Sequence, residues 1–496
     1  MKVLSHIIFL LLFTDILAQD NKQIEIINAN NSLTNNNKHP DFWKLIGDVK
    51  FKHNDIFMLC DSAYYYFDDN KIDAFSDIKI YDGNKINLTG EKLIYNGTSK
   101  EIDITGNVVF MDDHIILKTN KLNYKIESKT AFYPNAGKII NDEKTILSNE
   151  GVYISSTYKF IFKDSVQIIG KDYKINTDNM NYYSNSERAD FFGPSLIISK
   201  NKKMYCENGW YDTKNDIAQF HKNSRIITKD YQLHSDSLYY NKNNKYGNAT
   251  SNVNLLDTLN NILITGEIAE YYENEEKIEI TKKPILKLIS NNDTLFMHAD
   301  RFINKKIENE RNIIAYNKIK FFKNNIQGKC DSLSYNTNDS IIQMFTNPII
   351  WCNKNQITGD TVDIFTNKGE IDKLIINSNP MIITQEDSLD YNQIKGRYMN
   401  INFINNEIKK VYVDGNGKSL FIAKNKEDKK IGINYIESSS LYLNFIENDL
   451  YEITYNITPE STTKPYSKID EKNKYLENFN WREAERPQKK EDIFIE

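Results

Sequence analysis

The stretch Ser235-Asp236-Ser237-Leu238-Tyr239-Tyr240 carries the six-residue phrase that decides the fold. The phrase runs from a small residue through an acidic or amide residue, any residue, an apolar residue and any residue to Tyr. Other clear copies are Cys60-Asp61-Ser62-Ala63-Tyr64-Tyr65, Thr177-Asp178-Asn179-Met180-Asn181-Tyr182 and Cys330-Asp331-Ser332-Leu333-Ser334-Tyr335. We call the last position the mark; most marks follow one another at about 29 residues, and they are Tyr65, Tyr95, Tyr124, Tyr153, Tyr182, Tyr211, Tyr240, Tyr271, Asn304, Tyr335, Ile364, Ile401 and Leu443. A repeat of this length predicts a stacked array in which each unit buries its apolar side against its neighbours.

Alternation around the mark predicts strands. Inward residues are expected seven and five positions before the mark, two before it and at the mark itself, as in Leu117, Thr119, Leu122 and Tyr124. Each pair has the period of two that a half-buried strand requires. Between the pairs the phase slips by one residue at the acidic or amide position, so the backbone must bend there to keep both pairs on one side.

Turn signals separate the predicted strands. Polar tips such as Asn96-Gly97-Thr98-Ser99, Asn185-Ser186-Glu187 and Asn241-Lys242-Asn243-Asn244 follow the marks, and Asn-Gly is a strong hairpin signal. Gly106-Asn107 and Gly193-Pro194 stand where the returning strands should bend. We therefore predict an all-β fold, an elongated stack of bent strands with about 13 repeats of about 29 residues. A one-way solenoid also fits, but the tips favour an antiparallel meander.

The two ends of the chain differ from the repeat. Lys2 and the apolar run that follows it, with Ala18 before Gln19, predict a signal peptide over residues 1–18. Residues 19–40 are Asn-rich and are predicted to be a flexible lead-in, and residues 41–457 the repeat array. Residues 458–496, with three Pro and many charges, are predicted to be a tail whose Trp481 packs back on the last repeat or docks on a partner.

The charge balance argues against nucleic-acid binding, and the positions of the cysteines argue against disulfide bridges. The 63 basic and 68 acidic residues nearly balance, and no basic stripe for nucleic acid is present. Cys60, Cys206 and Cys330 take the small-residue position of separate copies. A disulfide needs Cα atoms within about 7 Å, so we expect small buried thiols rather than bridges.

Several segments resemble one known family. Gly106-Asn107-Val108-Val109-Phe110, residues 117–124 and residues 175–182 are similar to the OstA/LptA family of periplasmic lipopolysaccharide-transport proteins. The opening residues 47–51 and the closing Phe479-Asn480-Trp481-Arg482 resemble the long version found in Bacteroidetes. The resemblance extends over roughly residues 40–490, although the chain is several times longer than an ordinary LptA.

The resemblance implies a β-jellyroll, or β-taco, in which two sheets form a V around an apolar groove for lipid A acyl chains. It implies periplasmic lipopolysaccharide binding and transport towards the outer membrane. It also implies inner- and outer-membrane transport components with jellyroll domains as partners, and end-to-end stacking of copies. Apolar inward stripes can shelter hydrocarbon at about 0.8 kcal/mol per buried CH₂. Repeated units make sliding of a lipid from one unit to the next nearly neutral in free energy.

Candidate lipid-contacting residues are the inward positions of the phrase and the residues just before it. The Tyr ladder either contacts lipid or simply fills the core, and the ladder aliphatics share this ambiguity. The candidates are Leu59, Tyr65, Leu88, Leu93, Tyr95, Leu117, Leu122, Tyr124, Tyr153, Ile175, Met180, Tyr182, Tyr211, Leu233, Leu238, Tyr240, Ile264, Tyr271, Leu333, Tyr335 and Ile357.

The sequence gives only weak indications of metal binding or catalysis. The acidic residues at the corners could form a ladder of cation sites, but they more often accept hydrogen bonds from backbone groups of a turn. They are Asp61, Asp178, Asp236, Asp331 and Asp360. No metal-ligand spacing, nucleophile elbow or phosphate loop is present, so no metal, cofactor or enzymatic activity is predicted. Two alternatives remain at this point: a structural or adhesive β-solenoid at the cell surface, and a polysaccharide-acting β-helix enzyme.

Overall fold

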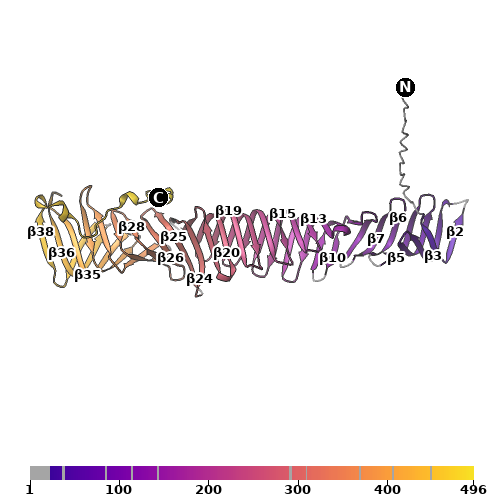
Figure 1. Ribbon diagram of the computed structural model, residues 1–496, viewed down its shortest axis with the longest axis horizontal. Helices are drawn as coiled ribbons and strands as arrows, with labels where there is room; N and C mark the ends of the chain where they lie inside the picture. Colours follow the sequence, from indigo (N-terminus) through magenta and orange to yellow (C-terminus); the bar gives the residue numbers. More distant parts are fainter. Residues whose placement is uncertain are drawn as a thin grey trace, which may run out of the picture. The chain divides into compact units, whose positions relative to one another are not determined.

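The computed structural model describes residues 23–35, 39–83, 86–112, 115–141, 144–289, 293–308, 310–367, 370–404, 407–446 and 449–495. Within these residues the regular structure is β-strands with short 3-10 helices, and no α-helix occurs (Figure 1). The chain divides into two compact units, residues 1–189 and residues 190–496. The predicted all-β repetitive fold is confirmed. The signal peptide expected over residues 1–18 lies outside the described residues.

Unit 1 is a succession of hairpins. Its strands are β1 (Glu25–Asn28), β2 (Asn31–Asn35), β3 (His39–His53), β4 (Ile56–Tyr66), β5 (Lys71–Asp82), β6 (Ile86–Asn96), β7 (Glu101–Asp112), β8 (Ile115–Lys125), β9 (Thr130–Tyr133), β10 (Gly137–Asn141), β11 (Lys144–Ser148), β12 (Glu150–Ile154), β13 (Lys159–Ile169) and β14 (Tyr173–Tyr183), with a 3-10 helix at Ser155–Thr157.

Unit 2 continues the same pattern, and its first strand begins at the boundary between the units. Its strands are β15 (Arg188–Ser199), β16 (Lys203–Asp212), β17 (Ile217–Ile227), β18 (Tyr231–Asn241), β19 (Tyr246–Asp257), β20 (Ile262–Tyr272), β21 (Lys277–Thr281), β22 (Ile285–Ile289), β23 (Thr294–His298), β24 (Arg301–Ile307), β25 (Glu310–Lys323), β26 (Ile326–Asn336), β27 (Ile341–Phe345), β28 (Ile349–Cys352), β29 (Asn355–Thr358), β30 (Thr361–Asn367), β31 (Glu370–Ile376), β32 (Met381–Gln385), β33 (Tyr391–Lys395), β34 (Tyr398–Ile404), β35 (Glu407–Lys424), β36 (Lys430–Ile446), β37 (Asp449–Asn456) and β38 (Glu460–Pro465). The 3-10 helices are Glu273–Glu275, Tyr466–Lys468, Glu471–Lys474, Glu483–Glu485 and Lys490–Phe494.

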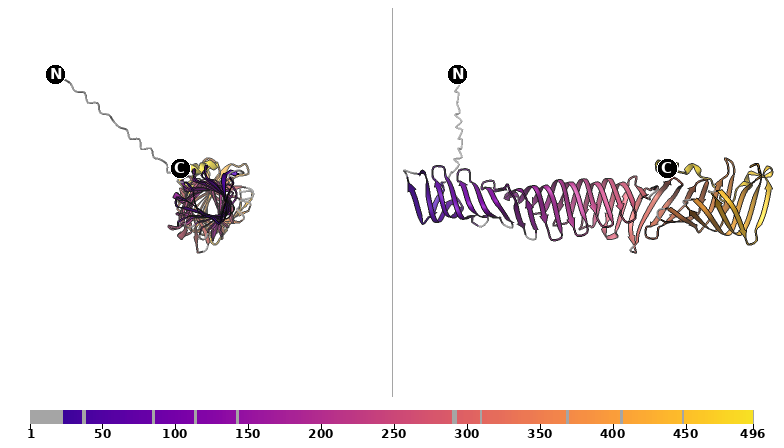
Figure 2. Two further views of the ribbon diagram at one scale, coloured as in Figure 1. Left: turned by 90° about the vertical axis from the view of Figure 1, so that its right-hand side faces the viewer. Right: turned by 180° about the vertical axis from the view of Figure 1, so that it is seen from behind.

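Neighbouring strands pair antiparallel, which confirms the predicted meander over the one-way solenoid (Figure 2). Where a bent strand is divided at its corner, each part pairs with the matching part of the next one, as β9 does with β12 and β10 with β11. The β7–β8 pair shows the register: Ile104 faces Leu122, and the register shifts between Thr105 and Val108. Across this shift the inward side chains of β8 are Leu117 and Leu122, both fully buried. The predicted phase slip is thus a real corner, and both arms of each bent strand point to one interior.

Left-handed residues make each corner on the returning strand. Gly106 has φ +83° and Asn107 has φ +45°, a backbone region open to Gly and tolerated by Asn. Equivalent pairs of positive φ stand at Ser76-Asp77, Asp164-Ser165, Lys222-Asn223, Ser251-Asn252, Asn317-Lys318 and Thr346-Asn347. The two left-handed residues lengthen one strand at the bend, which lets the facing strand change phase without losing its pairing.

Two of the corner acids, Asp236 and Asp360, accept hydrogen bonds from asparagines of the neighbouring bend. Asn252 Nδ2 donates to Asp236 Oδ2 at 2.6 Å, and Asn379 Nδ2 donates to Asp360 Oδ2 at 2.8 Å. Among the described residues, no cluster of three His, Cys, Asp or Glu could hold a metal ion. These contacts favour turn stabilisation as the role of Asp236 and Asp360.

The four cysteines are free and buried, as predicted for Cys60, Cys206 and Cys330. Burial raises the pKa of the Cys60 and Cys206 thiols to about 12. Both thiols therefore stay protonated at neutral pH and act as small apolar side chains in the core.

The predicted flexible lead-in needs correction where the structure describes it. β1 pairs with β3 through Ile26 and Phe51, and β2 pairs with β3 through Leu33 and Lys44. The Asn-rich sequence has little alternation to show these strands. They form because β3 offers its unpaired backbone groups at the end of the unit.

The C-terminal tail packs along the outer face of unit 2, so Trp481 packs back on the last repeats (Figure 1, yellow). It covers a second apolar cluster on that face, formed by Met381, Ile383, Leu420, Ile433 and Leu476, with Tyr391, Ile422, Tyr435, Tyr466, Ile469, Phe479 and Trp481 packed against it. The cluster is separate from the interior core, because these side chains leave the strands on the outer face. We call residues 466–495 the strap.

Three buried glutamines bind the backbone or a side chain of the strap. Gln393 Nε2 donates to Lys474 O at 2.8 Å, and Gln393 Oε1 accepts from Leu476 N at 2.7 Å. Gln356 makes the same pair of bonds with Asn480 O and Arg482 N, both at 2.7 Å. Gln327 Oε1 accepts from Arg486 Nε at 2.8 Å. Each glutamine stands eight residues before a mark, so the repeat itself spaces the anchors of the strap.

The strap is expected to loosen in acid. Hydrogen bonds from Arg482 and then Lys329 lower the pKa of Glu485 to about 2. A lowered pKa stabilises the fold fully above the ordinary value of about 4.3, and the contribution is lost as the pH falls towards 2. Glu485→Gln should therefore lower the melting temperature at pH 7 and make no difference near pH 2. Melting temperatures measured across this pH range test the prediction, with the exposed Glu427→Gln as control. A difference in melting temperature between variant and unmodified protein that does not change with pH would contradict it.

Candidate functional site

Two rows of turns run along each unit. The first row follows the marks and includes residues 97–100, 155–158 and 273–276; the second row joins the other strand ends and includes residues 170–172 and 258–261. Backbone hydrogen bonds link successive turns of the first row, for example Ser155 N to Lys129 O and Glu273 N to Lys245 O. Because the strands are bent, both rows border the same interior. We call the space between the rows the mouth.

In unit 1 polar contacts bridge the mouth. Tyr153 donates to Asp112 Oδ2 at 3.0 Å, and Ser155 Oγ donates to the same oxygen at 2.5 Å. Lys144 of the second row forms an ion pair with Glu187 of the first row. Asp112 is only 4% exposed, so its two donors compensate for the loss of hydration of a buried carboxylate. These contacts join the two arms of unit 1 across its mouth.

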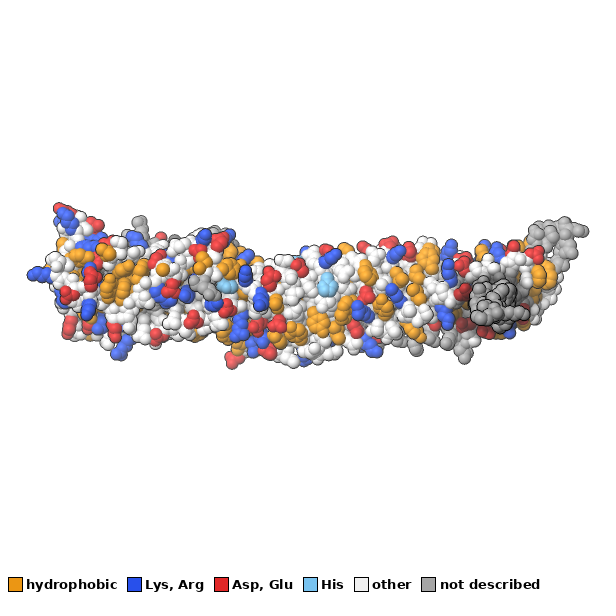
Figure 3. Space-filling view, turned by 45° about the horizontal axis from the view of Figure 1, so that its top comes forward, with side chains coloured by type: hydrophobic (Ala, Val, Ile, Leu, Met, Phe, Trp, Pro, Cys, Tyr) orange, Lys and Arg blue, Asp and Glu red, His pale blue; other side chains and the backbone are white. Residues whose placement is uncertain are grey.

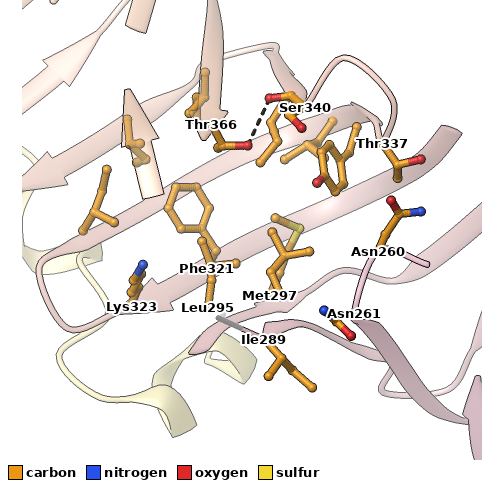
Figure 4. A pocket seen from close by; sticks show the side chains of 17 residues that line it. Asn260, Asn261, Ile289, Leu295, Met297, Phe321, Lys323, Thr337, Ser340 and Thr366 are labelled. Atoms are coloured by element: carbon orange, nitrogen blue, oxygen red, sulfur yellow. Dashed lines mark hydrogen bonds between the residues drawn. The ribbon is translucent and has the colours of Figure 1, made fainter. Parts of the chain in front are cut away.

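In unit 2 a cavity of about 320 Å³ opens between the two rows (Figure 4). This size lies at the low end for small-molecule sites, roughly 300–1,000 Å³. Most of its lining is aliphatic or aromatic, namely Leu288, Ile289, Leu295, Met297, Phe321, Ile326, Leu333, Tyr335, Ile342, Ile364 and Ile371. Polar residues stand at the rim, where Thr366 Oγ1 donates to Ser340 O at 3.1 Å. We call this space the apolar chamber.

A second cavity of about 440 Å³ lies beside the first, and Asn260 lines both. Its lining is mostly polar: Asp230, Tyr231, Leu259, Asn260, Tyr271, Glu276, Ile278, Asn304, Lys306, Arg311 and Asn338. Arg311 of the first row and Asp230 of the second row approach to 3.8 Å at its mouth. We call this space the polar chamber.

The inward candidates separate into two groups. Those of unit 1 are closely packed: Tyr65, Tyr95, Tyr153 and Tyr182 are at most 1% exposed. The other buried candidates are Leu88, Leu93, Leu117, Leu122, Tyr124, Ile175 and Met180 in unit 1, with Tyr211, Leu238, Ile264, Leu333 and Ile357 in unit 2. Leu233, Tyr240, Tyr271 and Tyr335 of unit 2 are half-buried, and the last two line the chambers. The tyrosine ladder thus fills the interior in unit 1 and borders open space in part of unit 2.

Leu59 does not face the interior and is corrected here. It pairs with Lys50 and Lys79 and is half-exposed, whereas Met58 is 1% exposed. Met58 and Cys60 stand seven and five residues before the mark Tyr65, so the alternation itself assigns Leu59 to the outer side.

Several chamber residues were absent from the sequence-based candidates. Met297, Phe321 and Ile342 line the apolar chamber from β23, β25 and β27, strands in which no candidate was predicted. A period-two reading of β23, β25 and β27 could have found them, because Met297 pairs with Phe321 and Ile342 pairs with Tyr335.

The tyrosines of the mouth keep their protons. Burial raises the pKa of Tyr271 to about 12 and also raises the pKa of Tyr231. Their hydroxyls are therefore neutral donors and acceptors at physiological pH.

The face of the molecule seen in Figure 3 has no single charge character. In Figure 3 basic and acidic side chains are interspersed with small apolar groups over the face shown. Within the described part of the chain, no helix has the length and apolar character needed to cross a bilayer.

Fold and site together define an antiparallel β-stack whose bent strands enclose an apolar interior, filled in unit 1 and open at two cavities in unit 2. A family model described as OstA-like protein matches residues 21–178 and again residues 174–236. Residues 21–236 are therefore an OstA-like region, which confirms the resemblance there. At the family level OstA-like proteins are linked to transport of lipopolysaccharide or other lipid, are in general periplasmic, and are not enzymes.

Other comparisons add little. No curated protein sequence matches the chain. Among solved structures, the WD40 domain of SCAP from fission yeast aligns with 69% of this chain and 87% of its own, at 10% identity and a TM-score of 0.11. A score this low carries no argument about fold or function.

Proposed function

We propose that this protein binds lipopolysaccharide in the periplasm and guides it towards the outer membrane. The observation that carries the proposal is the apolar chamber of unit 2, which opens between the two rows of turns. Hydrocarbon gains about 0.8 kcal/mol for each CH₂ removed from water, so a few methylenes in this chamber give substantial affinity. The OstA-like region supplies the family context.

The transport route follows from the repeat. Successive copies present similar inward side chains, so a lipid shifted by one copy exchanges similar contacts and no large barrier arises from binding alone. The bridges of unit 1, such as Lys144–Glu187 and Asp112–Tyr153, would have to part for acyl chains to enter there. Partners with jellyroll domains in the inner and outer membranes, and other copies of this chain, would extend the route at the ends of the stack.

Photo-crosslinking in cells tests the proposal. A photoreactive amino acid at Leu333, which is 2% exposed and lines the apolar chamber, should crosslink lipopolysaccharide. The same amino acid at Ser334, the next residue on β26, points to the outer side and is the matched control. Equal lipid adducts at both positions, or none at Leu333, would contradict a binding role and favour a structural one.

A further inference from the structure

Asn304 is the one polar mark in the series of marks, where eight earlier copies have Tyr. It lies on β24 between Ile278 of β21 and Ile313 of β25, and its side chain lines the polar chamber. The residue is 7% exposed, yet its amide makes no hydrogen bond to any residue that the structure describes. The amide is not one of the fully enclosed polar atoms that lack a partner, because it lines the open polar chamber, where a ligand hydroxyl could reach it.

The loss of the ring also makes room. A tyrosine at this mark would project towards the same interior as Tyr271, which also lines the polar chamber. Asn304 replaces that ring with a short amide that can both donate and accept. The chamber therefore combines space with unused hydrogen-bonding capacity at one point of the apolar ladder.

The charges of the chamber favour a neutral ligand over a phosphate. Arg311 lies 3.8 Å from Asp230, and Lys306 lies 3.5 Å from Glu276. The two cations are thus offset by two anions, and no net positive charge is left for an anion. Asn260, Asn304 and Asn338 add amides that suit hydroxyl groups, and Tyr271 adds an aromatic wall.

We infer that the polar chamber binds a sugar ring of the lipid headgroup while the apolar chamber beside it holds acyl chains. This inference rests on the proposed function and assigns a place in the fold to the headgroup sugar of that lipid. The shared residue Asn260 places the two chambers side by side, as the two ends of an amphiphile require. A site built to hydrogen-bond hydroxyls discriminates strongly against ligands that lack them.

Binding of three probes to the full chain tests the inference. The probes are purified lipopolysaccharide, the oligosaccharide left after its acyl chains are removed, and phosphatidylglycerol, which has acyl chains and no sugar. Asn304→Tyr restores the residue of the other copies and fills the chamber. It should weaken lipopolysaccharide binding at least about tenfold, equivalent to about 1.4 kcal/mol, and abolish the saturation-transfer signal of the oligosaccharide. Phosphatidylglycerol binding should not change.

Two further variants keep the test decisive. Asn304→Leu removes the amide at similar size and should also weaken both sugar-bearing probes. Ile303→Tyr adds a ring to the outer side of the same strand and should change none. Unchanged lipopolysaccharide and oligosaccharide binding by Asn304→Tyr, or equal loss of phosphatidylglycerol, would overturn the inference. An oligosaccharide bound as tightly as lipopolysaccharide would identify free glycan rather than headgroup as the source. Crosslinking of lipopolysaccharide at Leu333 is measured independently of these binding assays. Loss of that crosslink would contradict the proposed function, whereas the Asn304 variants test only the sugar site.

Discussion

Deleting the strap together with the last residue, Glu496, is expected to unfold the last hairpins of unit 2 and to leave unit 1 folded. The deletion exposes Met381, Ile383, Leu420 and Ile433, each at most 4% exposed in the intact protein. Re-exposing side chains of this size costs on the order of 5 kcal/mol in total, even if only part of each is uncovered. That loss is comparable to the whole stability of many domains.

The effect should stay local because repeat stacks are stabilised mainly by contacts between neighbours. Amide hydrogen exchange is the suitable measurement, since it reports protection strand by strand. Strands β32–β36 should lose protection while β4–β8 keep theirs. Equal protection of β32–β36 with and without the strap would contradict the expectation.

A point variant separates the hydrogen-bonded anchors from the apolar cover. Gln393→Ala removes two bonds to the strap backbone and should raise exchange in the strap and in β33. Gln343→Ala is the matched control, because Gln343 lies on the outer side of β27 and bonds Asp363 instead of the strap. The control should leave strap protection unchanged.

Leu333→Trp is expected to abolish lipid binding while the fold is retained. Leu333 lines the apolar chamber, whose volume of about 320 Å³ can accept the larger ring with little strain. The indole would occupy the space that we assign to acyl chains. Displacing even four methylenes costs about 3 kcal/mol, which is more than a hundredfold in affinity.

Lipopolysaccharide binding by the purified variant, together with its melting temperature, measures this effect. Ser334→Trp adds the same ring to the outer side of β26 and is the control. A Leu333→Trp protein that binds lipopolysaccharide normally and melts normally would show that the chamber is not the lipid site. A large fall in melting temperature would mean the chamber cannot hold the ring, and Met297→Phe is then the smaller replacement to test.

The three glutamines that bind the strap were not predicted from the sequence. Gln327, Gln356 and Gln393 stand at one position of the repeat, eight residues before their marks, so a column-by-column comparison of copies could have singled them out. Gln232 stands at the same position before Tyr240 and is exposed. The residue type alone therefore did not predict a strap; the path of the tail decides which glutamine is buried.

The apolar and polar chambers were not predicted from the sequence either. The alternation placed Tyr182 and Tyr335 in the same class, yet the first is 1% exposed and the second borders a cavity. Whether the interior is filled depends on the summed volume of side chains from several strands and on bridges such as Lys144–Glu187, which are 43 residues apart. Neither quantity is a property of a single copy.

Alternation and turn chemistry act over a few neighbouring residues, so the all-β repeat, the inward positions and the corner at each phrase could be predicted from the chain alone. The open stretch of the interior, the position of Asn304 beside open space and the path of the strap became known from the folded arrangement. Those outcomes depend on how distant strands and the tail fill space together, and packing of that kind leaves no local pattern in the chain.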